Sequence, residues 1–226
     1  MALGPLFFTG CMFPEVVITK DPLTAVEHGR LAAVYESKGE YDLAEKEYTA
    51  ALEREPANVA AAMELGNLYL KMGAYGKAER VYKKALKGAP DSGPLHNNLS
   101  WAYMGLGDLN GAERSVKRAL DLDGSRRPIY LDTLGVIHTR RGEYDSAEAR
   151  LMKALKGVGP DDRAGRTEIY THLIELYTAW GKGKKAAAFA AQRGEGVEKE
   201  NSGGRVRFVE ESQQKSGREE GSEFRP

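Results

Sequence analysis

Cysteine, an excess of either charge and long hydrophobic runs are all missing or scarce in this sequence of 226 residues. The single cysteine, Cys11, excludes an intramolecular disulfide and a zinc site built from several thiolates. No run of about 18 apolar residues occurs, so the sequence predicts no transmembrane helix. Lysine plus arginine number 33, and aspartate plus glutamate also number 33. Because phosphate binding depends on an excess of positive charge, this balance argues against nucleic acid as the partner.

The motifs of common catalytic and cofactor sites are absent from the sequence as well. The chain has no HExxH pair, no GxSxG nucleophile, no P-loop and no GxGxxG that opens a helix after a strand. The four histidines, none of them paired at a spacing of four residues, are His28, His96, His138 and His172. We therefore expect a protein that is not an enzyme and that holds neither a cofactor nor a metal.

An internal repeat of about 34 residues organises the middle of the chain. The glycine series of this repeat is Gly39, Gly73, Gly107, Gly142 and Gly181. The alanine series is Ala44, Ala78, Ala112, Ala147 and Ala186. Tyrosine and the pair Ala-Leu recur with a similar step. Several independent columns with one period indicate a repeated structural unit.

Each period carries two apolar stripes with helical spacing. In the second period, four residues recur at i, i+3, i+4 and i+7, which is one face of a helix: Ala62, Leu65, Gly66 and Tyr69. Gly73 interrupts the pattern, because glycine at a helix end can adopt a positive φ, and a second stripe then runs to Pro90. Each period therefore predicts a helix–turn–helix whose apolar stripes must be covered by the next unit.

These periods resemble the tetratricopeptide repeat. In the second period, the small residues Gly66, Ala78 and Ala85 and the aromatic residue Tyr82 fall on the family pattern. Five repeats are expected, over residues 25–58, 59–92, 93–126, 128–160 and 167–193. The resemblance implies an all-α, right-handed superhelical solenoid over residues 25–193, and a protein that binds other proteins or peptides.

A glutamate follows the repeated alanine in four repeats, at Glu45, Glu79, Glu113 and Glu148. A row of carboxylates can serve as a cation site or an acid–base site. We interpret it as structural, because a glutamate near a helix N-terminus complements the helix dipole. The pairs Glu79–Lys83 and Glu113–Lys117 are also expected to form i,i+4 ion pairs.

Residues 1–10 resemble a bacterial lipoprotein signal segment. In the run Phe8-Thr9-Gly10-Cys11, small side chains precede the cysteine whose thiol carries the lipid in lipoproteins. Phe8 replaces the commoner leucine, few residues precede Cys11 and no lysine or arginine marks a charged start. A start codon placed too far downstream explains the last two departures. We expect residues 11–24 to tether the repeats to a membrane through Cys11.

The expected location is the cell envelope. Met12 after the cysteine resembles lipoproteins sorted to the outer membrane, with the repeats facing the periplasm. A cytoplasmic scaffold without lipid, whose apolar N-terminus forms a cap, is an open alternative. A third reading is an accessory subunit of an envelope enzyme such as a peptidase, because residues 21–28 resemble the start of some tetratricopeptide lipoproteins in Gram-negative bacteria. In that segment, Thr24 and Glu27 predict a capping box at a helix start.

The two remaining predictions concern the tail and the binding groove. Residues 194–226 are rich in glycine, serine and charged side chains, and such a composition predicts a disordered tail.

In a superhelix of tetratricopeptide repeats, the first helix of each repeat lines the inner groove. The positions that point inward are Asn67, Asn97, Asn98, Trp101, Thr139 and Arg140. Asparagine can donate to and accept from a peptide backbone, and tryptophan offers a large apolar surface. The basic residues of carboxylate-clamp repeats are missing, so we expect no reading of a C-terminal carboxylate.

Overall fold

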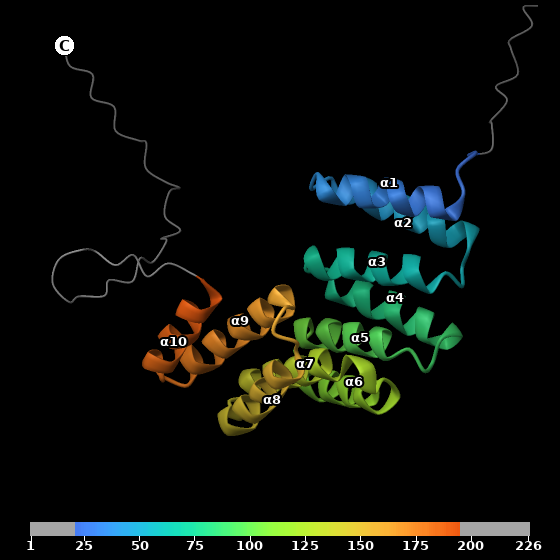
Figure 1. Ribbon diagram of the computed structural model, residues 1–226. Helices are drawn as coiled ribbons and strands as arrows, with labels where there is room; N and C mark the ends of the chain where they lie inside the picture. The colour runs from blue at the N-terminus through green and yellow to red at the C-terminus, as the bar shows by residue number, and fades with distance from the viewer. Residues whose placement is uncertain (1–20, 195–226) are drawn as a thin grey trace, which may run out of the picture. The chain divides into compact units, whose positions relative to one another are not determined.

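The computed structural model describes residues 21–194, and these residues form ten α-helices, one short 3-10 turn and no strand (Figure 1). The all-α repeat fold that the sequence predicts is therefore confirmed. The described residues divide into two compact units, 21–122 and 123–194.

The first unit consists of three helical hairpins, each with a first and a second helix. They are α1 (Ala25–Ser37) with α2 (Tyr41–Arg54), α3 (Val59–Lys71) with α4 (Tyr75–Gly88), and α5 (Gly93–Gly105) with α6 (Leu109–Leu122). The second helix of each hairpin packs against the first helix of the next, α2 on α3 and α4 on α5 (Figure 1). Neighbouring hairpins therefore bury the apolar stripes that no single hairpin can bury alone.

Side chains just before the first helices define where these helices start. The Thr24 hydroxyl oxygen accepts a hydrogen bond from the Glu27 N–H, and the Glu27 carboxylate accepts one from the Thr24 N–H at 2.8 Å. The predicted capping box at α1 is thus confirmed. Asn58 and Ser92 cap α3 and α5 in the same way, through the N–H groups three residues further on.

A glycine with a positive φ ends each hairpin turn. The five are Gly39 (78°), Gly73 (71°), Gly107 (80°), Gly142 (77°) and Gly181 (74°). Residues with a β-carbon rarely adopt this left-handed conformation, which explains why glycine recurs here. The helix–turn–helix reading of each period is confirmed.

The second hairpin closes around Gly66, where α3 and α4 approach closely. A β-carbon built on Gly66 would lie 2.3 Å from a ring carbon of Tyr82, so only glycine leaves room for that ring. Ala78 and Tyr82 are both fully buried at this crossing. The prediction that small residues mark the helix crossing is confirmed for this hairpin.

The second unit begins with the 3-10 turn η1 (Gly124–Arg126) and contains two hairpins. They are α7 (Arg127–Arg141) with α8 (Tyr144–Gly157), and α9 (Arg163–Ala179) with α10 (Gly183–Arg193). The fifth repeat was expected to start at residue 167, but α9 begins at Arg163. Asp162 caps α9 by accepting from the Gly165 N–H, which accounts for the earlier start.

Aromatic side chains close the last hairpin, in which Gly183 replaces the aromatic residue of the family pattern. The rings of Tyr177 and Phe189 stack with their centroids 5.7 Å apart. Tyr144 on α8 and Trp180, with ring centroids 5.6 Å apart, join this hairpin to the one before it. Offset ring pairs of this kind add stability beyond their buried area.

The predictions for residues 1–10, for Cys11 and for the tail after Gly194 lie outside the described residues. No helix within 21–194 has both the length and the apolar character needed to cross a membrane.

Candidate peptide-binding face

The six residues predicted to line the groove lie on three first helices. Asn67 is on α3, and Asn97, Asn98 and Trp101 are on α5, all in the first unit. Thr139 and Arg140 are on α7, in the second unit. The first unit therefore carries four of the six, and it brings two of them into direct contact.

Asn67 and Asn98 form one hydrogen-bonded pair that joins α3 to α5. The Asn98 Nδ2 donates to the Asn67 Oδ1 at 2.9 Å, and the Tyr82 hydroxyl donates to the same oxygen at 2.7 Å. Tyr82 is fully buried, and this burial raises the pKa of its hydroxyl, so the group stays a neutral donor. The buried tyrosine therefore fixes the orientation of both amides.

The hydrogen-bonding capacity left on this pair suits a peptide backbone. The Asn67 Nδ2 and the Asn98 Oδ1 make no hydrogen bond to any other residue of 21–194, and both side chains are half-buried. One free donor and one free acceptor match the carbonyl oxygen and the N–H of an extended chain. Trp101 lies one helical turn after Asn98 and is also only half-buried.

Asn97 departs from the prediction, because it is only 6% exposed. Consecutive residues of a helix point about 100° apart, so Asn97 cannot share the direction of Asn98. The open groove position that the sequence predicts for Asn97 is wrong.

The two residues of the second unit differ from each other in exposure. The Thr139 hydroxyl donates to the Gly135 carbonyl at 3.0 Å, within its own helix, so its hydrogen is already used. Arg140 is exposed. Their role in binding stays a prediction.

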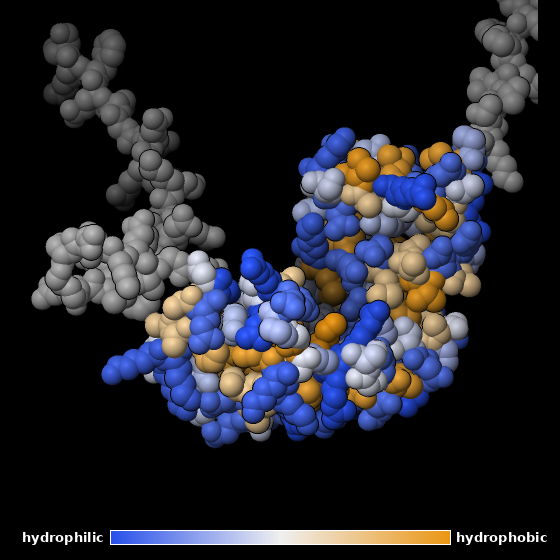
Figure 2. Space-filling view, viewed as in Figure 1, coloured by the Kyte–Doolittle hydropathy of each residue, from blue (hydrophilic) through white to orange (hydrophobic). Residues whose placement is uncertain are grey.

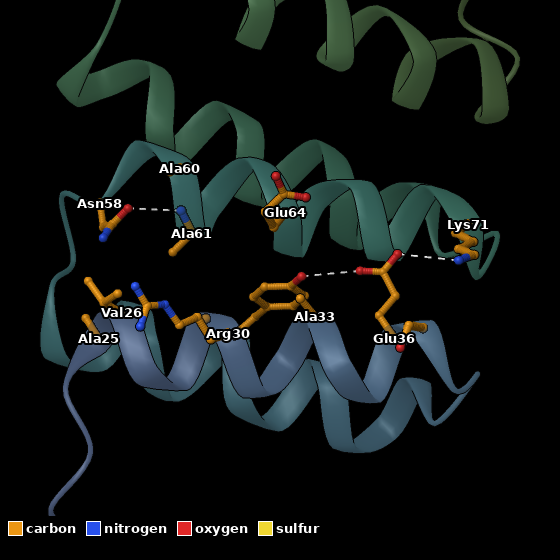
Figure 3. A pocket seen from close by; sticks show the side chains of 13 residues that line it. Ala25, Val26, Arg30, Ala33, Glu36, Asn58, Ala60, Ala61, Glu64 and Lys71 are labelled. Atoms are coloured by element: carbon orange, nitrogen blue, oxygen red, sulfur yellow. Dashed lines mark hydrogen bonds and ion pairs between the residues drawn. The ribbon is translucent and has the colours of Figure 1, made fainter. Parts of the chain in front are cut away.

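A pocket that the sequence analysis missed lies between α1 and α3 (Figure 3). It has a volume of about 640 Å³, and its walls include the small residues Gly29, Ala33 and Ala60. In Figure 3 the side chains of Arg30 and Ala33 point from α1 towards α3. The signal in the sequence is a run of small residues at inward positions, where the second repeat has Met63 and Asn67.

Charged side chains surround the apolar floor of this pocket. Glu36 on α1 and Lys71 on α3 form an ion pair of 3.5 Å across its end, and the Tyr48 hydroxyl donates to Glu36 at 3.3 Å. Burial, and after it the charge of Glu36, raises the pKa of Tyr48 to about 12. Arg30 and Glu64 also line the pocket, and neither forms an ion pair with a residue of 21–194.

Two of the repeated glutamates form hydrogen bonds to the next repeat, which the sequence analysis does not predict. Glu45 accepts hydrogen bonds from the Tyr69 hydroxyl and from Lys77 Nζ, both at 2.8 Å and both in the next repeat. The hydrogen bond from Lys77, with a smaller contribution from Tyr69, lowers the pKa of Glu45. The second unit repeats this arrangement with Glu148, Tyr177 and Lys185. These two glutamates therefore join neighbouring repeats. Each is the fifth residue of its helix, beyond the first turn in which the helix dipole acts, so the dipole interpretation is wrong for them.

The other two glutamates form the predicted i,i+4 ion pairs. Lys83 lies 2.6 Å from Glu79, and Lys117 lies 2.6 Å from Glu113. These two predictions are confirmed.

The four histidines all bind nearby protein oxygens. Their acceptors are Glu47 for His28, the Pro90 carbonyl for His96, Glu143 for His138 and Asp132 for His172. Over residues 21–194 no group of three or more histidine, cysteine, aspartate or glutamate side chains is arranged to hold a metal ion. The contacts of these histidines are structural, within and between the helices.

Comparison with family models agrees with the helical hairpins described above. A family model described as tetratricopeptide repeat matches residues 30–93, and a second model of the same description matches residues 70–132. Together the two models cover residues 30–132, and this part of the chain consists of tetratricopeptide repeats. Among the curated proteins, none matches the chain in sequence.

Solved structures, two tetratricopeptide repeat proteins among them, share the fold. A thermophilic member from Thermus thermophilus is 26% identical with a TM-score of 0.65, over 78% of this chain and 93% of that one. A member from Parabacteroides merdae is 22% identical with a TM-score of 0.65. The match covers 76% of this chain and only 65% of the Parabacteroides protein. The pilF protein of Pseudomonas aeruginosa is 21% identical, with a TM-score of 0.58 over 76% of each chain.

Proposed function

We propose that this protein is a non-catalytic scaffold that binds a peptide segment of a partner protein on the inner face formed by α1, α3 and α5. The tetratricopeptide repeats support the general role of a protein-interaction scaffold. The observation that carries the finer proposal is the oriented pair Asn67–Asn98, with one donor and one acceptor left for a ligand.

The bound segment is extended in this proposal. One backbone carbonyl of the peptide accepts from the Asn67 Nδ2, and a neighbouring N–H donates to the Asn98 Oδ1. An apolar side chain of the peptide then packs on Trp101, since large aromatic residues commonly provide most of the energy at such interfaces. A second apolar side chain enters the pocket between α1 and α3, whose volume of about 640 Å³ suits one large side chain with room for water.

Site-specific photocrosslinking in the native host tests this binding face. A photoreactive amino acid at Trp101 is expected to capture a partner that mass spectrometry identifies from a single contiguous peptide. The matched control carries the same group at Lys84, an exposed residue of α4, a helix outside the proposed binding face. Equal capture at both positions, or no capture at Trp101, would contradict the proposed face.

The proposal also includes a membrane anchor on Cys11, with the repeats facing the periplasm from the outer membrane. Its support is the run Phe8-Thr9-Gly10-Cys11, which resembles the signal of bacterial lipoproteins. Acyl chains attached to one thiol provide an anchor, because each buried methylene adds about 0.8 kcal/mol of membrane affinity.

Palmitate labelling in the native host tests the anchor. The wild-type chain is expected to incorporate labelled palmitate and to enter the detergent phase, and Cys11→Ser is expected to abolish both. Recovery of the wild-type protein with an unmodified Met1 would favour the cytoplasmic scaffold instead. Loss of the anchor leaves the proposal for the inner face intact, because the two depend on different residues.

A further inference from the structure

The first repeat exposes an apolar position that the next two repeats bury. Val34 on α1, Leu68 on α3 and Ala102 on α5 occupy the same place in their repeats, 34 residues apart. Val34 is 47% exposed, whereas Leu68 and Ala102 are both 0% exposed. Leu43, on α2 of the same repeat, is another large apolar side chain and is 44% exposed. We call the surface around Val34 and Leu43 the open face of the first repeat, and Figure 2 shows apolar side chains exposed over α1.

In the second repeat, the equivalent surface is covered by the helix that precedes it. Ala61 on α3 packs in one cluster with Ala51 and Leu52 of α2. Leu68 belongs to a larger cluster against which Leu52 also packs. Residues 51 and 52 therefore lie on the stripe of α2 that covers α3. The open face of α1 has no such preceding helix among residues 21–194.

The chain approaches α1 in the way that it approaches α3 and α5. Prolines recur two residues before each N-cap, and the three pairs are Pro22 and Thr24, Pro56 and Asn58, and Pro90 and Ser92. Asp21 is held in place, since its carboxylate lies 3.0 Å from His28 Nε2 and its carbonyl accepts from Arg54. Asp21 therefore has the place in its repeat that Glu55, the residue after α2, has in the next one.

We propose that residues 16–20, with the sequence VVITK, pack on the open face of the first repeat as a cap. Val17 and Ile18 stand 34 residues before Ala51 and Leu52, in the register of the stripe that covers α3. Pro14 and the β-branched run Val16 to Thr19 disfavour a helix and favour an extended segment. The cap therefore replaces the apolar contacts of a preceding helix without adding another repeat.

Thiol reactivity tests the cap with two matched cysteine variants of the full chain, both carrying Cys11→Ser. Val34→Cys places the thiol on the open face, and Val26→Cys places it on the same helix in the wall of the pocket. Val26 is 55% exposed and Val34 is 47% exposed, so an uncapped helix predicts similar rates with N-ethylmaleimide. The cap predicts that the thiol at position 34 reacts at least about tenfold more slowly than the thiol at position 26.

Charge introduced into the cap provides the second arm of the test. Val17→Asp with Ile18→Asp is expected to bring the rate at position 34 up to the rate at position 26, and to leave the latter unchanged. Circular dichroism shows whether the repeats remain folded in this variant. Equal rates at the two positions in the chain without the aspartates would overturn the proposal, whether or not the double variant folds.

A second copy of the chain is the competing occupant of the open face. Protection by a second copy depends on protein concentration, whereas protection by residues 16–20 is independent of it. Protection at position 34 that disappears on dilution, or that persists in the aspartate variant, would also overturn the proposal. Neither outcome bears on peptide binding, because Asn67, Asn98 and Trp101 lie outside the open face.

Discussion

The two places where first helices meet in the first unit differ sharply. Between α1 and α3 there is a pocket of about 640 Å³ with small residues in its walls. Between α3 and α5 a hydrogen-bonded pair, Asn67 with Asn98, joins the helices. Both junctions join neighbouring repeats of the same type, so the size of a few side chains decides which junction contains a pocket.

The inward positions of the repeats show this dependence directly. At one position the first repeat has Gly29 and the second has Met63. At the position four residues further on, the first repeat has Ala33 and the second has Asn67. A repeat scaffold can therefore provide a pocket or a polar pair at one place in the fold through substitutions at two positions.

Adding one methyl group to a helical glycine is expected to distinguish the pocket between α1 and α3 from the tight crossing of α3 and α4 most clearly. Gly66→Ala forces a β-carbon into the ring of Tyr82 and should lower the free energy of unfolding by about 1–3 kcal/mol. Gly29→Ala meets no atom within 4 Å and should raise it by up to about 1 kcal/mol, through helix propensity. Urea denaturation measures both, and a shift of the same sign in both variants would break the comparison.

Removal of one hydroxyl tests the polar pair. Tyr82→Phe leaves the Asn67 Oδ1 with one donor instead of two, and should cost about 1 kcal/mol. It should also weaken peptide binding, because the asparagine amides lose the group that orients them. Thermal unfolding and titration with a bound peptide measure the two effects. An unchanged melting temperature would show that the bond to Tyr82 does not form.

A smaller effect is expected from pH at the junction of the first two repeats. The pKa of Glu45 is lowered in the folded state by hydrogen bonds from Lys77 and Tyr69. The stability that this shift contributes is present above the ordinary glutamate pKa, near 4.5, and is lost as pH falls through the lowered pKa. Glu45→Gln should therefore reduce the fall in melting temperature between neutral pH and about pH 3. A fall in melting temperature as large as that of the wild-type chain would show that Glu45 does not contribute to the loss of stability in acid.

Much of the fold follows from local sequence signals. The turn glycines, the capping box at Thr24 and the stripes of the hairpins depend only on neighbours within a few residues. The start of α9 was missed because Asp162 supplies a cap that interrupts the repeat register.

The candidate site was less accessible to sequence reasoning. Asn98 and Asn67 were found from the repeat register, but the helical rotation between neighbouring residues buries Asn97. The partners of Glu45 lie 24 and 32 residues away, and helical periodicity alone indicates partners only three or four residues away. The pocket depends on side chains from two repeats, so it becomes visible only when the hairpins are packed.

Peptide binding by a Trp101→Ala variant is the most direct test of the proposed inner face. A peptide selected from a displayed library against the full chain provides the ligand, and its dissociation constant is measured for both proteins. The account predicts at least about tenfold weaker binding by the variant, with helicity and melting temperature nearly unchanged. Unchanged affinity, or a variant that unfolds, would show that Trp101 is a packing residue and would contradict the proposed binding face.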